Sequence, residues 1–272
     1  MIAIASCLQA VNQRIREAAA ACGRELDEIR LLAISKTWSA AAVGEAYAAG
    51  QLAFGESYVQ EAMEKIGLLA ELGKPPPGAL ESRMGAAIGN GSIEDGTPGL
   101  AAEISLPTDV RPVFRPLEWH FVGPIQSNKT RQIAEHFAWV HSVDRLSIAE
   151  RLSRARPSHL PDLQICLQIN VSGEASKSGA APDSTLELAR AASRLPKLRL
   201  RGLMTIPRPT PDFGEQRAQF ARLYELRQVV LRDGIPLDTL SMGMSDDLEA
   251  AIAEGATIVR VGTAIFGPRD RR

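Results

Sequence analysis

Length, composition and charge set the first bounds on this sequence. The chain has 272 residues, of which 45% are hydrophobic and 23% charged, as in ordinary soluble globular proteins. This length suits one large domain, and α/β barrels commonly reach it. The formal net charge of −1 gives no field that would gather nucleic acid or an anionic membrane surface. We therefore expect no nucleic acid and no membrane among its partners.

The three cysteines, Cys7, Cys22 and Cys166, lack the spacing of metal ligands and stand in apolar surroundings. We expect buried thiols of a reducing compartment rather than a disulfide framework or a metal site. Residues 1–13 follow an amphipathic pattern and carry no basic segment before an apolar one. No apolar run has the length that a membrane span requires. These features predict a cytoplasmic protein.

Strand-like and helix-like apolar spacing alternate along the chain after a first helix at 4–22. Ser39 and Asp144 are positioned to cap two of the later helices. Eight short strands are predicted at 31–34, 52–54, 119–123, 139–143, 163–171, 200–206, 237–240 and 258–261. The helices predicted between them lie at 39–50, 55–72, 128–136, 144–155, 184–194, 213–232 and 246–254.

Eight strands alternating with helices at this length predict a closed (β/α)8 barrel, a TIM barrel. Continuous apolar strands such as 163–169 are typical of a parallel sheet buried on both faces. An open doubly wound sheet is the alternative, but no glycine-rich dinucleotide motif follows the first strand. We therefore favour a single α/β barrel domain spanning residues 1–272.

One segment, 73–116, interrupts the alternation between the second helix and the third strand. It is rich in glycine and proline, and a structureless connection of this length is uncommon within a compact domain. We interpret it as a largely irregular insertion with one helical patch at 82–88. It is either a partner-binding arm or a tolerated surface loop, and the surface loop is favoured.

Lys36 stands where the first strand leaves the predicted sheet. A lysine at the end of a buried run needs a function or an exit to water. An amine whose pKa is lowered by desolvation can form a Schiff base with an aldehyde. The alternative is a side chain that snorkels to solvent, and this stretch alone favours that alternative.

Two further strand ends have the composition of an anion site. Ser241–Ser245 is a glycine-containing turn that runs into a helix, and Gly262–Thr263 follows the eighth strand. Backbone N–H groups and hydroxyls in such turns can hold a phosphate. Either turn alone is as well explained by an ordinary helix cap. Two of them after the seventh and eighth strands favour a phosphate site, because TIM barrels commonly bind phosphate there.

Arg260 lies inside the apolar eighth strand, where a guanidinium needs a partner. It could face the ring nitrogen or the phosphate of a cofactor, or pair with a carboxylate such as Glu254. Lys36, Arg260 and the two turns together indicate a phosphorylated cofactor that carries an aldehyde. Pyridoxal 5′-phosphate (PLP) is the common cofactor of this kind.

Eight stretches of the sequence match the sequence pattern of a known protein family: 32–37, 54–61, 119–129, 168–171, 176–179, 201–207, 241–245 and 260–267. Through them the sequence resembles the pyridoxal-phosphate homeostasis proteins, whose fold is like the N-terminal barrel of alanine racemase. The resemblance implies that Lys36 carries PLP as an internal aldimine and that Arg260 lies close to it. It also implies that Ser241, Ser245, Gly262 and Thr263 hold the phosphate. Further candidate cofactor-binding residues on the matching stretches are Ser57, Asn170, Met204, Met242 and Gly243.

Two features depart from the family pattern. Ser57 stands where the family usually has asparagine, so a contact to the ring substituents is expected to be lost or water-bridged. The insertion at 73–116 is the second departure. Neither involves Lys36 or the phosphate turns, and we expect cofactor binding to be retained.

Two functions compete on this basis. The first, implied by the resemblance, is a PLP carrier that supports vitamin B6 and amino-acid balance without strong catalytic activity. It would act as a monomer or weak dimer, with PLP-requiring apoenzymes as candidate recipients. The second is a PLP enzyme such as an amino-acid racemase, which needs a base on each face of the α-carbon.

The sequence favours the carrier over the racemase. In alanine racemases the second base comes from a β-rich domain, and we expect that this chain lacks such a domain. Tyr47, Tyr58 and Tyr224 fall in helical stretches where packing is the expected role. His120 lies within a strand and is expected to be a hydrogen-bonded core histidine. An interaction protein that acts through 73–116 remains a third alternative.

Overall fold

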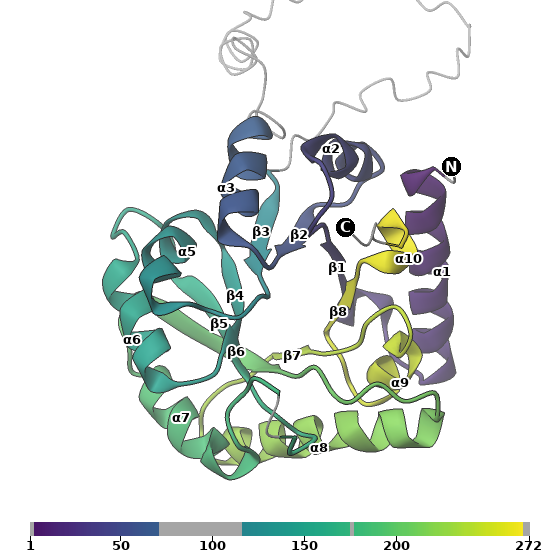
Figure 1. Cartoon of the computed structure of the whole chain (residues 1–272). Coiled ribbons are helices and arrows are strands. Elements are labelled where there is room, and N and C mark those ends of the chain that lie inside the picture. Colours follow the sequence, from purple (N-terminus) through teal and green to yellow (C-terminus); the bar gives the residue numbers. More distant parts are fainter. Residues whose placement is uncertain (1–2, 71–115, 175–176, 269–272) are drawn as a thin grey trace, which may run out of the picture. The chain divides into compact units, whose positions relative to one another are not determined.

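The structure is a computed structural model that describes residues 3–70, 116–174 and 177–268 (Figure 1). The expected insertion at 73–116 and its helical patch at 82–88 lie outside the described residues, except for Pro116. Those expectations therefore stay predictions.

Eight parallel strands close into a barrel in chain order, and pairing of the first strand with the eighth completes the ring. Helices lie outside this ring (Figure 1). The predicted (β/α)8 barrel is confirmed. The strands are β1 (Arg30–Ile34), β2 (Ala53–Glu56), β3 (Glu118–Phe121), β4 (Trp139–Val143), β5 (Leu163–Gln168), β6 (Leu198–Met204), β7 (Thr239–Ser241) and β8 (Ile258–Val261).

The helices follow the strands along the described chain. The α-helices are α1 (Ile4–Ala21), α2 (Ala40–Ala48), α3 (Val59–Leu68), α5 (Thr130–His136), α6 (Leu146–Ala155), α7 (Thr185–Ala192), α8 (Phe213–Arg232), α9 (Leu248–Ala253) and α10 (Thr263–Phe266). Three single turns of 3-10 helix are η1 (Leu26–Glu28), η2 (Ser127–Lys129) and η3 (Pro182–Ser184). No helix within the described residues is long and apolar enough to cross a bilayer.

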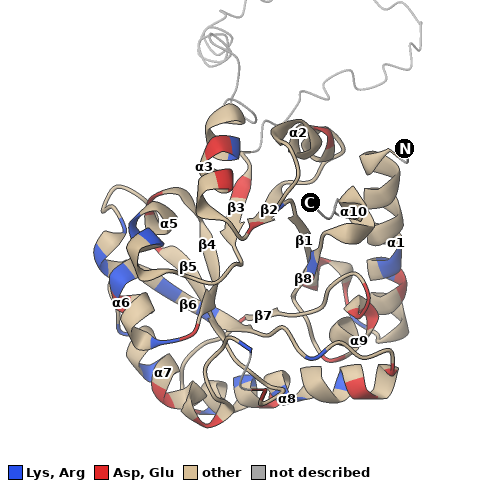
Figure 2. Cartoon of the chain, in the orientation of Figure 1, with Lys and Arg blue, Asp and Glu red and all other residues tan. Residues whose placement is uncertain are grey.

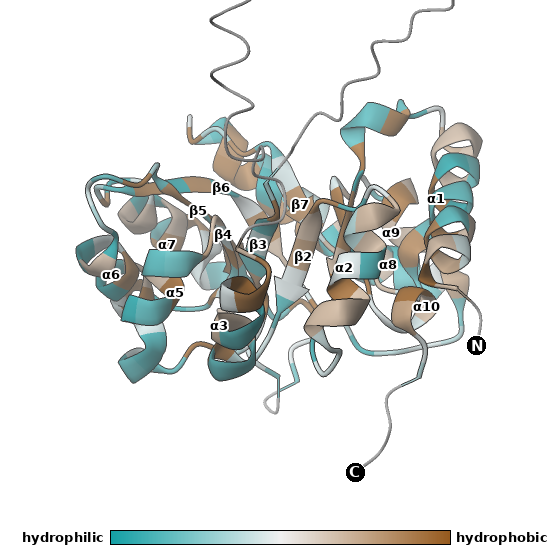
Figure 3. Cartoon of the chain, turned by 90° about the horizontal axis from the view of Figure 1, so that it is seen from above, coloured by the Kyte–Doolittle hydropathy of each residue, from teal (hydrophilic) through white to brown (hydrophobic). Residues whose placement is uncertain are grey.

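Apolar side chains fill both the interior of the barrel and the layer between strands and helices. The interior cluster draws buried residues from strands on opposite sides of the ring, including Leu32 of β1, Trp139 of β4 and Met204 of β6. Outside the strands, helices turn apolar stripes inward, as α1 does with Leu8, Val11 and Ile15. Figure 3 shows hydrophobic colour on much of the strands and both hydrophilic and hydrophobic colour on the helices around them. Charges of both signs are interspersed on the outer helices (Figure 2).

The structure differs from the prediction at the start of the second helix, at one helix cap and in one additional helix. Gly55 and Glu56 extend β2 by pairing with β1 and β3, so α3 begins at Val59 and not at 55. Asp144 does not cap α6, because its carboxylate accepts a hydrogen bond from Arg145 instead (2.7 Å). Helix α10 was not predicted. The predicted Ser39 cap is confirmed, since its hydroxyl accepts from the N–H of Ala42.

The expectation of three buried thiols was also wrong. Cys166 is fully buried on β5, and burial raises the pKa of its thiol to about 12. Cys22 is exposed, because it lies just past the last turn of α1, and Cys7 is partly buried. All three are free, as expected.

Candidate cofactor site

Lys36 lies in the turn that follows β1, half-buried, between two residues whose backbone is held in place. Ser35 is fully buried and donates its hydroxyl hydrogen to Glu56 Oε1 (2.7 Å), while its carbonyl accepts from Lys65 Nζ (2.6 Å). Thr37 has φ of +70°, which non-glycine residues rarely adopt. The chain therefore turns sharply at a fixed point, and the barrel presents Lys36 at its C-terminal end.

The loop that carries Lys36 packs against the turn that follows β8. Ala33 pairs with Val261, so Lys36 leaves the sheet beside Gly262 and Thr263. The rings of Trp38 and Phe266 stack with their centroids 5.9 Å apart. These contacts bring the predicted lysine next to one of the two predicted phosphate turns.

The two predicted phosphate turns also touch each other. Ser245 Oγ accepts from the N–H of Ala264 at 3.3 Å, which joins the turn after β7 to the turn after β8. Gly243 has φ of +93°, and a Cβ there would lie 2.6 Å from the Cβ of Ala251. Glycine is therefore required at this position, which keeps the turn close to the helix that follows. Thr263 is exposed beside these two turns.

Arg260 is 5% exposed and is bonded within the barrel. Its Nη1 donates to the carbonyl and hydroxyl oxygens of Ser241 (2.5 and 2.9 Å), and Nη2 donates to the carbonyl of Thr205 (2.8 Å). Burial lowers its pKa to about 10, so it stays charged at neutral pH. The alternative partner Glu254 pairs with Arg217 instead (2.6 Å).

The other predicted residues lie at the same end of the barrel, but their side chains differ in burial and in hydrogen-bond partners. Asn170 binds its own loop, donating to the carbonyl of Glu174 (2.8 Å). Met204 is fully buried in the interior cluster, and Met242 is fully buried in the turn after β7. Ser57 is half-buried directly after β2. The hydroxyl of Ser241 is bonded to Arg260 and His141 (2.9 and 2.7 Å), and its expected phosphate contact stays a prediction.

Sequence reasoning missed the buried ion pair below Lys36. Glu56 and Lys65 are 0% and 4% exposed, and Lys65 Nζ also donates to Glu61 Oε1 (2.6 Å). The one signal in the sequence was the charged residue Glu56 close to the end of the second predicted strand, and the structure shows that this strand includes Glu56.

The expectation for His120 is confirmed, since both ring nitrogens have partners (2.6 and 2.8 Å). The described part of the chain holds no group of three His, Cys, Asp or Glu residues that could bind a metal.

Gly123 keeps the chain at Ser57 in place, and we expect Gly123→Ala to destabilise the protein. A Cβ at Gly123 would lie 2.6 Å from Ser57 Cα, which backbone atoms cannot easily relieve. We expect the free energy of unfolding to fall by about 1–3 kcal/mol, measured by urea denaturation. Gly44→Ala is the matched control, because a Cβ there meets nothing within 4 Å and should not destabilise. Equal effects of the two changes would contradict the packing argument.

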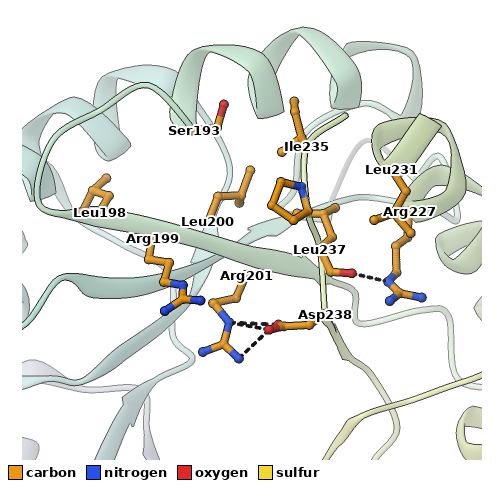
Figure 4. Close-up of a pocket in the computed structure, with 11 residues that line it drawn as sticks. Ser193, Leu198, Arg199, Leu200, Arg201, Arg227, Leu231, Ile235, Leu237 and Asp238 are labelled. Carbon is orange, nitrogen blue, oxygen red and sulfur yellow. Dashed lines mark hydrogen bonds and ion pairs between the residues drawn. The ribbon is translucent and has the colours of Figure 1, made fainter. Parts of the chain in front are cut away.

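A separate cavity of about 400 Å³ lies where β6 begins and includes none of the predicted residues (Figure 4). Its charged groups are largely paired already. Arg201 binds Asp238 (2.7 Å), and Arg227 donates to the carbonyl of Leu237 (2.9 Å). This cavity is therefore not part of the site around Lys36.

Comparison with known proteins places the chain in a family. Residues 6–270 match the family described as alanine racemase, N-terminal domain. A pyridoxal phosphate homeostasis protein of Pseudomonas aeruginosa is 53% identical over 270 residues, which are 99% of this chain and 97% of that protein. The namesake of Escherichia coli K12 is 46% identical over 268 residues, covering 98% and 97% of the two chains. The chain belongs to the pyridoxal phosphate homeostasis proteins.

Solved structures agree with this membership. PipY of Synechococcus elongatus, a structure described as having PLP bound, is 33% identical with a TM-score of 0.68, and the match covers 93% of this chain and all of that one (100%). Alanine racemase of Corynebacterium glutamicum is 14% identical with a TM-score of 0.59, covering 96% and 62% of the two chains. At that identity the likeness shows the fold alone. The resemblance found in the sequence is confirmed.

Proposed function

We propose that this member of the pyridoxal phosphate homeostasis proteins binds PLP reversibly through a Schiff base on Lys36. The observation that supports this most directly is the contact between the Lys36 loop and α10, the short helix after β8, made by Trp38 and Phe266. The PLP-bound structure of PipY, a relative of the same family, supports the choice of cofactor. In this proposal the protein holds PLP for intracellular vitamin B6 homeostasis and amino-acid balance in the cytoplasm.

The groups present fit this cofactor. PLP supplies an aldehyde that condenses with a primary amine, and Lys36 supplies that amine. Ser245 and Thr263 offer hydroxyls for the phosphate beside two glycines, Gly243 and Gly262, whose bare backbone allows close approach. A Cβ on Gly262 would lie 3.2 Å from the carbonyl of Ile34, so the turn is packed closely against the end of β1. Arg260 adds a buried positive charge behind these turns.

The same geometry supports a carrier rather than an enzyme. Racemisation needs two acid–base groups that are free to exchange protons. Thr205 donates its hydroxyl hydrogen to a backbone carbonyl, and Ser142 does the same (2.8 and 2.5 Å). His120 and His141 are fully buried, and burial lowers the pKa of both imidazoles. These four side chains are thus committed to internal bonds. We include PLP-requiring apoenzymes as recipients and a monomer or weak dimer as the active form.

An absorption spectrum of the purified protein tests the proposal. PLP added to the protein should give a visible Schiff-base band, and borohydride should remove the band and fix the cofactor on the peptide that contains Lys36. Mass spectrometry of the digested protein locates the adduct. No band after PLP is added, or an adduct mapped only to other lysines, would contradict the proposal.

The phosphate turns give a further expected result. Ser245→Ala and Thr263→Ala each remove one hydroxyl donor for a charged phosphate, a bond worth roughly 1.5–3 kcal/mol. We expect each variant to raise the dissociation constant for PLP by about tenfold or more, measured by the absorption band. Ser184→Ala is the control, because its exposed hydroxyl bonds only to the carbonyl of Ala181. Unchanged affinity in both turn variants would refute the phosphate assignment.

A further inference from the structure

A continuous chain of hydrogen bonds crosses the interior of the barrel. It begins at Glu118, the first residue of β3, whose Oε1 lies 2.6 Å from His120 Nε2. His120 Nδ1 lies 2.8 Å from His141 Nε2 on β4. His141 Nδ1 lies 2.7 Å from Ser241 Oγ on β7, and Ser241 Oγ accepts from Arg260 Nη1 at 2.9 Å. We refer to Glu118, His120, His141 and Ser241 as the interior chain.

The interior chain runs through the barrel rather than along its wall. Strands β4 and β7 are not neighbours in the ring, so the bond from His141 to Ser241 passes through the interior. Glu118 opens its strand and Ser241 ends its strand, so the chain connects the N-terminal end of the barrel with the C-terminal end. His120, His141 and Ser241 are 0% exposed. At the C-terminal end of the barrel this chain meets Arg260 through the hydroxyl of Ser241.

When both imidazoles are neutral, the groups at the two ends fix the direction of every bond. An ionised Glu118 can only accept and Arg260 can only donate. His120 must then donate from Nε2, which leaves its Nδ1 as an acceptor for His141 Nε2–H. His141 Nδ1 in turn accepts from the hydroxyl of Ser241, whose oxygen accepts from Arg260. His120, His141 and Ser241 therefore each donate once and accept once along the chain, and both imidazoles are Nε2–H tautomers.

The surroundings support these charge states. Burial lowers the pKa of His120 and of His141, which keeps both rings neutral. Burial alone would raise the pKa of Glu118, but the hydrogen bond from His120 and the charge of Arg30 lower it on balance. Arg30 Nη1 lies 2.8 Å from Glu118 Oε1. His120 also stacks on Trp139 at 5.5 Å with the rings nearly parallel (4°), which holds the imidazole in place.

One of the contacts that orient Arg260 comes from the hydroxyl of Ser241, the last residue of the interior chain. A guanidinium has five N–H donors, and three of them go to Ser241 O, Ser241 Oγ and Thr205 O. The hydroxyl hydrogen of Ser241 is used by His141, so its oxygen faces Arg260 as an acceptor. His120 fixes the tautomer of His141, and His141 fixes the hydroxyl of Ser241, through which Arg260 makes one of its three contacts.

We propose that Glu118, His120, His141 and Ser241 are positioning residues that hold the Arg260 guanidinium in one orientation toward the cofactor site. The cofactor part of this inference rests on the proposed function, whereas the orientation of Arg260 does not. If these residues had a purely structural role, they would only satisfy one another's buried polar groups. Changing His120 would then affect neither Arg260 nor bound PLP. The two roles therefore differ in measurable ways.

Nuclear magnetic resonance of the ¹⁵N-labelled protein without PLP tests the chain directly. The four histidines include exposed His136 and His159 as internal reference signals. We expect His120 and His141 both to show the Nε2–H tautomer with an unprotonated Nδ1. An Nδ1–H tautomer or a doubly protonated ring at either position would overturn the proposal. This measurement needs no variant and so does not depend on the folding of one.

A variant at His120, three hydrogen bonds away from Arg260, tests positioning. His120→Phe keeps an aromatic ring on Trp139 but removes both bonds of His120. We expect the side-chain N–H signal of Arg260, assigned by its loss in Arg260→Gln, to shift, and His141 to leave the pure Nε2–H state. Ser153→Ala is the control, because it removes a buried hydrogen bond on α6 (2.6 Å to the carbonyl of Pro196) outside the barrel interior. Unchanged Arg260 and His141 signals in His120→Phe would overturn the proposal.

The cofactor provides an independent readout. Arg260→Gln should change the absorption maximum of bound PLP and speed its release. His120→Phe and His141→Phe should shift the maximum in the same direction and speed release by about tenfold, while Ser153→Ala should match the wild type. Wild-type spectra and release rates in both histidine variants would overturn positioning at the cofactor. Failure of wild-type protein to bind PLP would instead overturn the proposed function, and the Arg260 signals would still decide the orientation.

Discussion

The Lys36→Ala variant should lose the covalent PLP adduct while keeping its fold. Lys36 is the residue that the fixed turn after β1 presents beside the phosphate turns, and only an amine can condense with the aldehyde. We expect the Schiff-base band to disappear and no cofactor to be trapped by borohydride at stoichiometric PLP. Circular dichroism should be unchanged, because the half-buried side chain of Lys36 is not part of the apolar core.

Lys129→Ala is the matched control for this experiment. Lys129 ends the 3-10 turn after β3, so it is another lysine at the C-terminal end of the barrel. Its removal should leave the band and the adduct at Lys36 unchanged. An undiminished adduct in Lys36→Ala, mapped to another lysine, would show that the position of Lys36 is not what selects the cofactor.

Removal of Lys65 should cause the largest loss of stability. Its ammonium is the charged partner of Glu56, which is 0% exposed and already has one oxygen, Oε2, without a hydrogen bond. Lys65→Met leaves this carboxylate buried and unpaired. Such a change typically costs about 3–5 kcal/mol. We expect a loss of that size in the free energy of unfolding at neutral pH, measured by urea denaturation.

The loss should depend on pH in a defined direction. Burial raises the pKa of Glu56 above its ordinary value of 4.5, against the opposing effect of Lys65. When a carboxyl has a higher pKa in the folded protein than in the unfolded protein, it favours the folded state at pH values below the unfolded-state pKa. That contribution is lost as the pH rises through the folded-state pKa. Without Lys65 the folded pKa rises further. The deficit of Lys65→Met should therefore be small near pH 4.5 and grow towards neutral pH.

Two further variants check the origin of this effect. Adding Glu56→Gln to Lys65→Met should recover much of the lost stability, because the buried charge is then absent. Arg131→Met removes an exposed ion pair of the same i,i+4 spacing as Lys65 with Glu61 and should have no measurable effect. A double variant no more stable than Lys65→Met, or a deficit independent of pH, would show that packing of the Lys65 stem is the cause.

The comparison of prediction with structure separates what local patterns encode from what they do not. The alternation of apolar strands and amphipathic helices predicted the barrel, because a parallel strand buried on both faces must be followed by a crossover that covers it. Once the barrel was predicted, chain order alone placed Lys36, Ser245 and Thr263 at one end. This part of the site was predictable because all strands of such a barrel point the same way.

The boundaries of short elements were less predictable. Gly55 and Glu56 resembled a helix start in the sequence, yet Gly55 pairs with β1 and β3 and Glu56 pairs with β3. Helix α10 is a single short turn without a cap hydrogen bond from a side chain, so no local signal marked it. Cys22 lies in the same apolar stretch as buried alanines, but the end of α1 leaves it exposed. Only the extension of β2 is explained by pairing with neighbouring strands.

The sequence by itself determined the barrel, the end at which the site is built, and the lysine that the first strand presents there. Only the tertiary structure decided which buried polar groups are partners. Ser241 and His141 are 100 positions apart, and Lys65 reaches Glu56 from a different element. Such pairings depend on how strands are staggered around the closed ring and on which side chains meet inside it. The spacing of residues along the sequence does not predict these pairings. A hydrogen bond requires two atoms within about 3 Å of each other in space, whatever their separation along the chain.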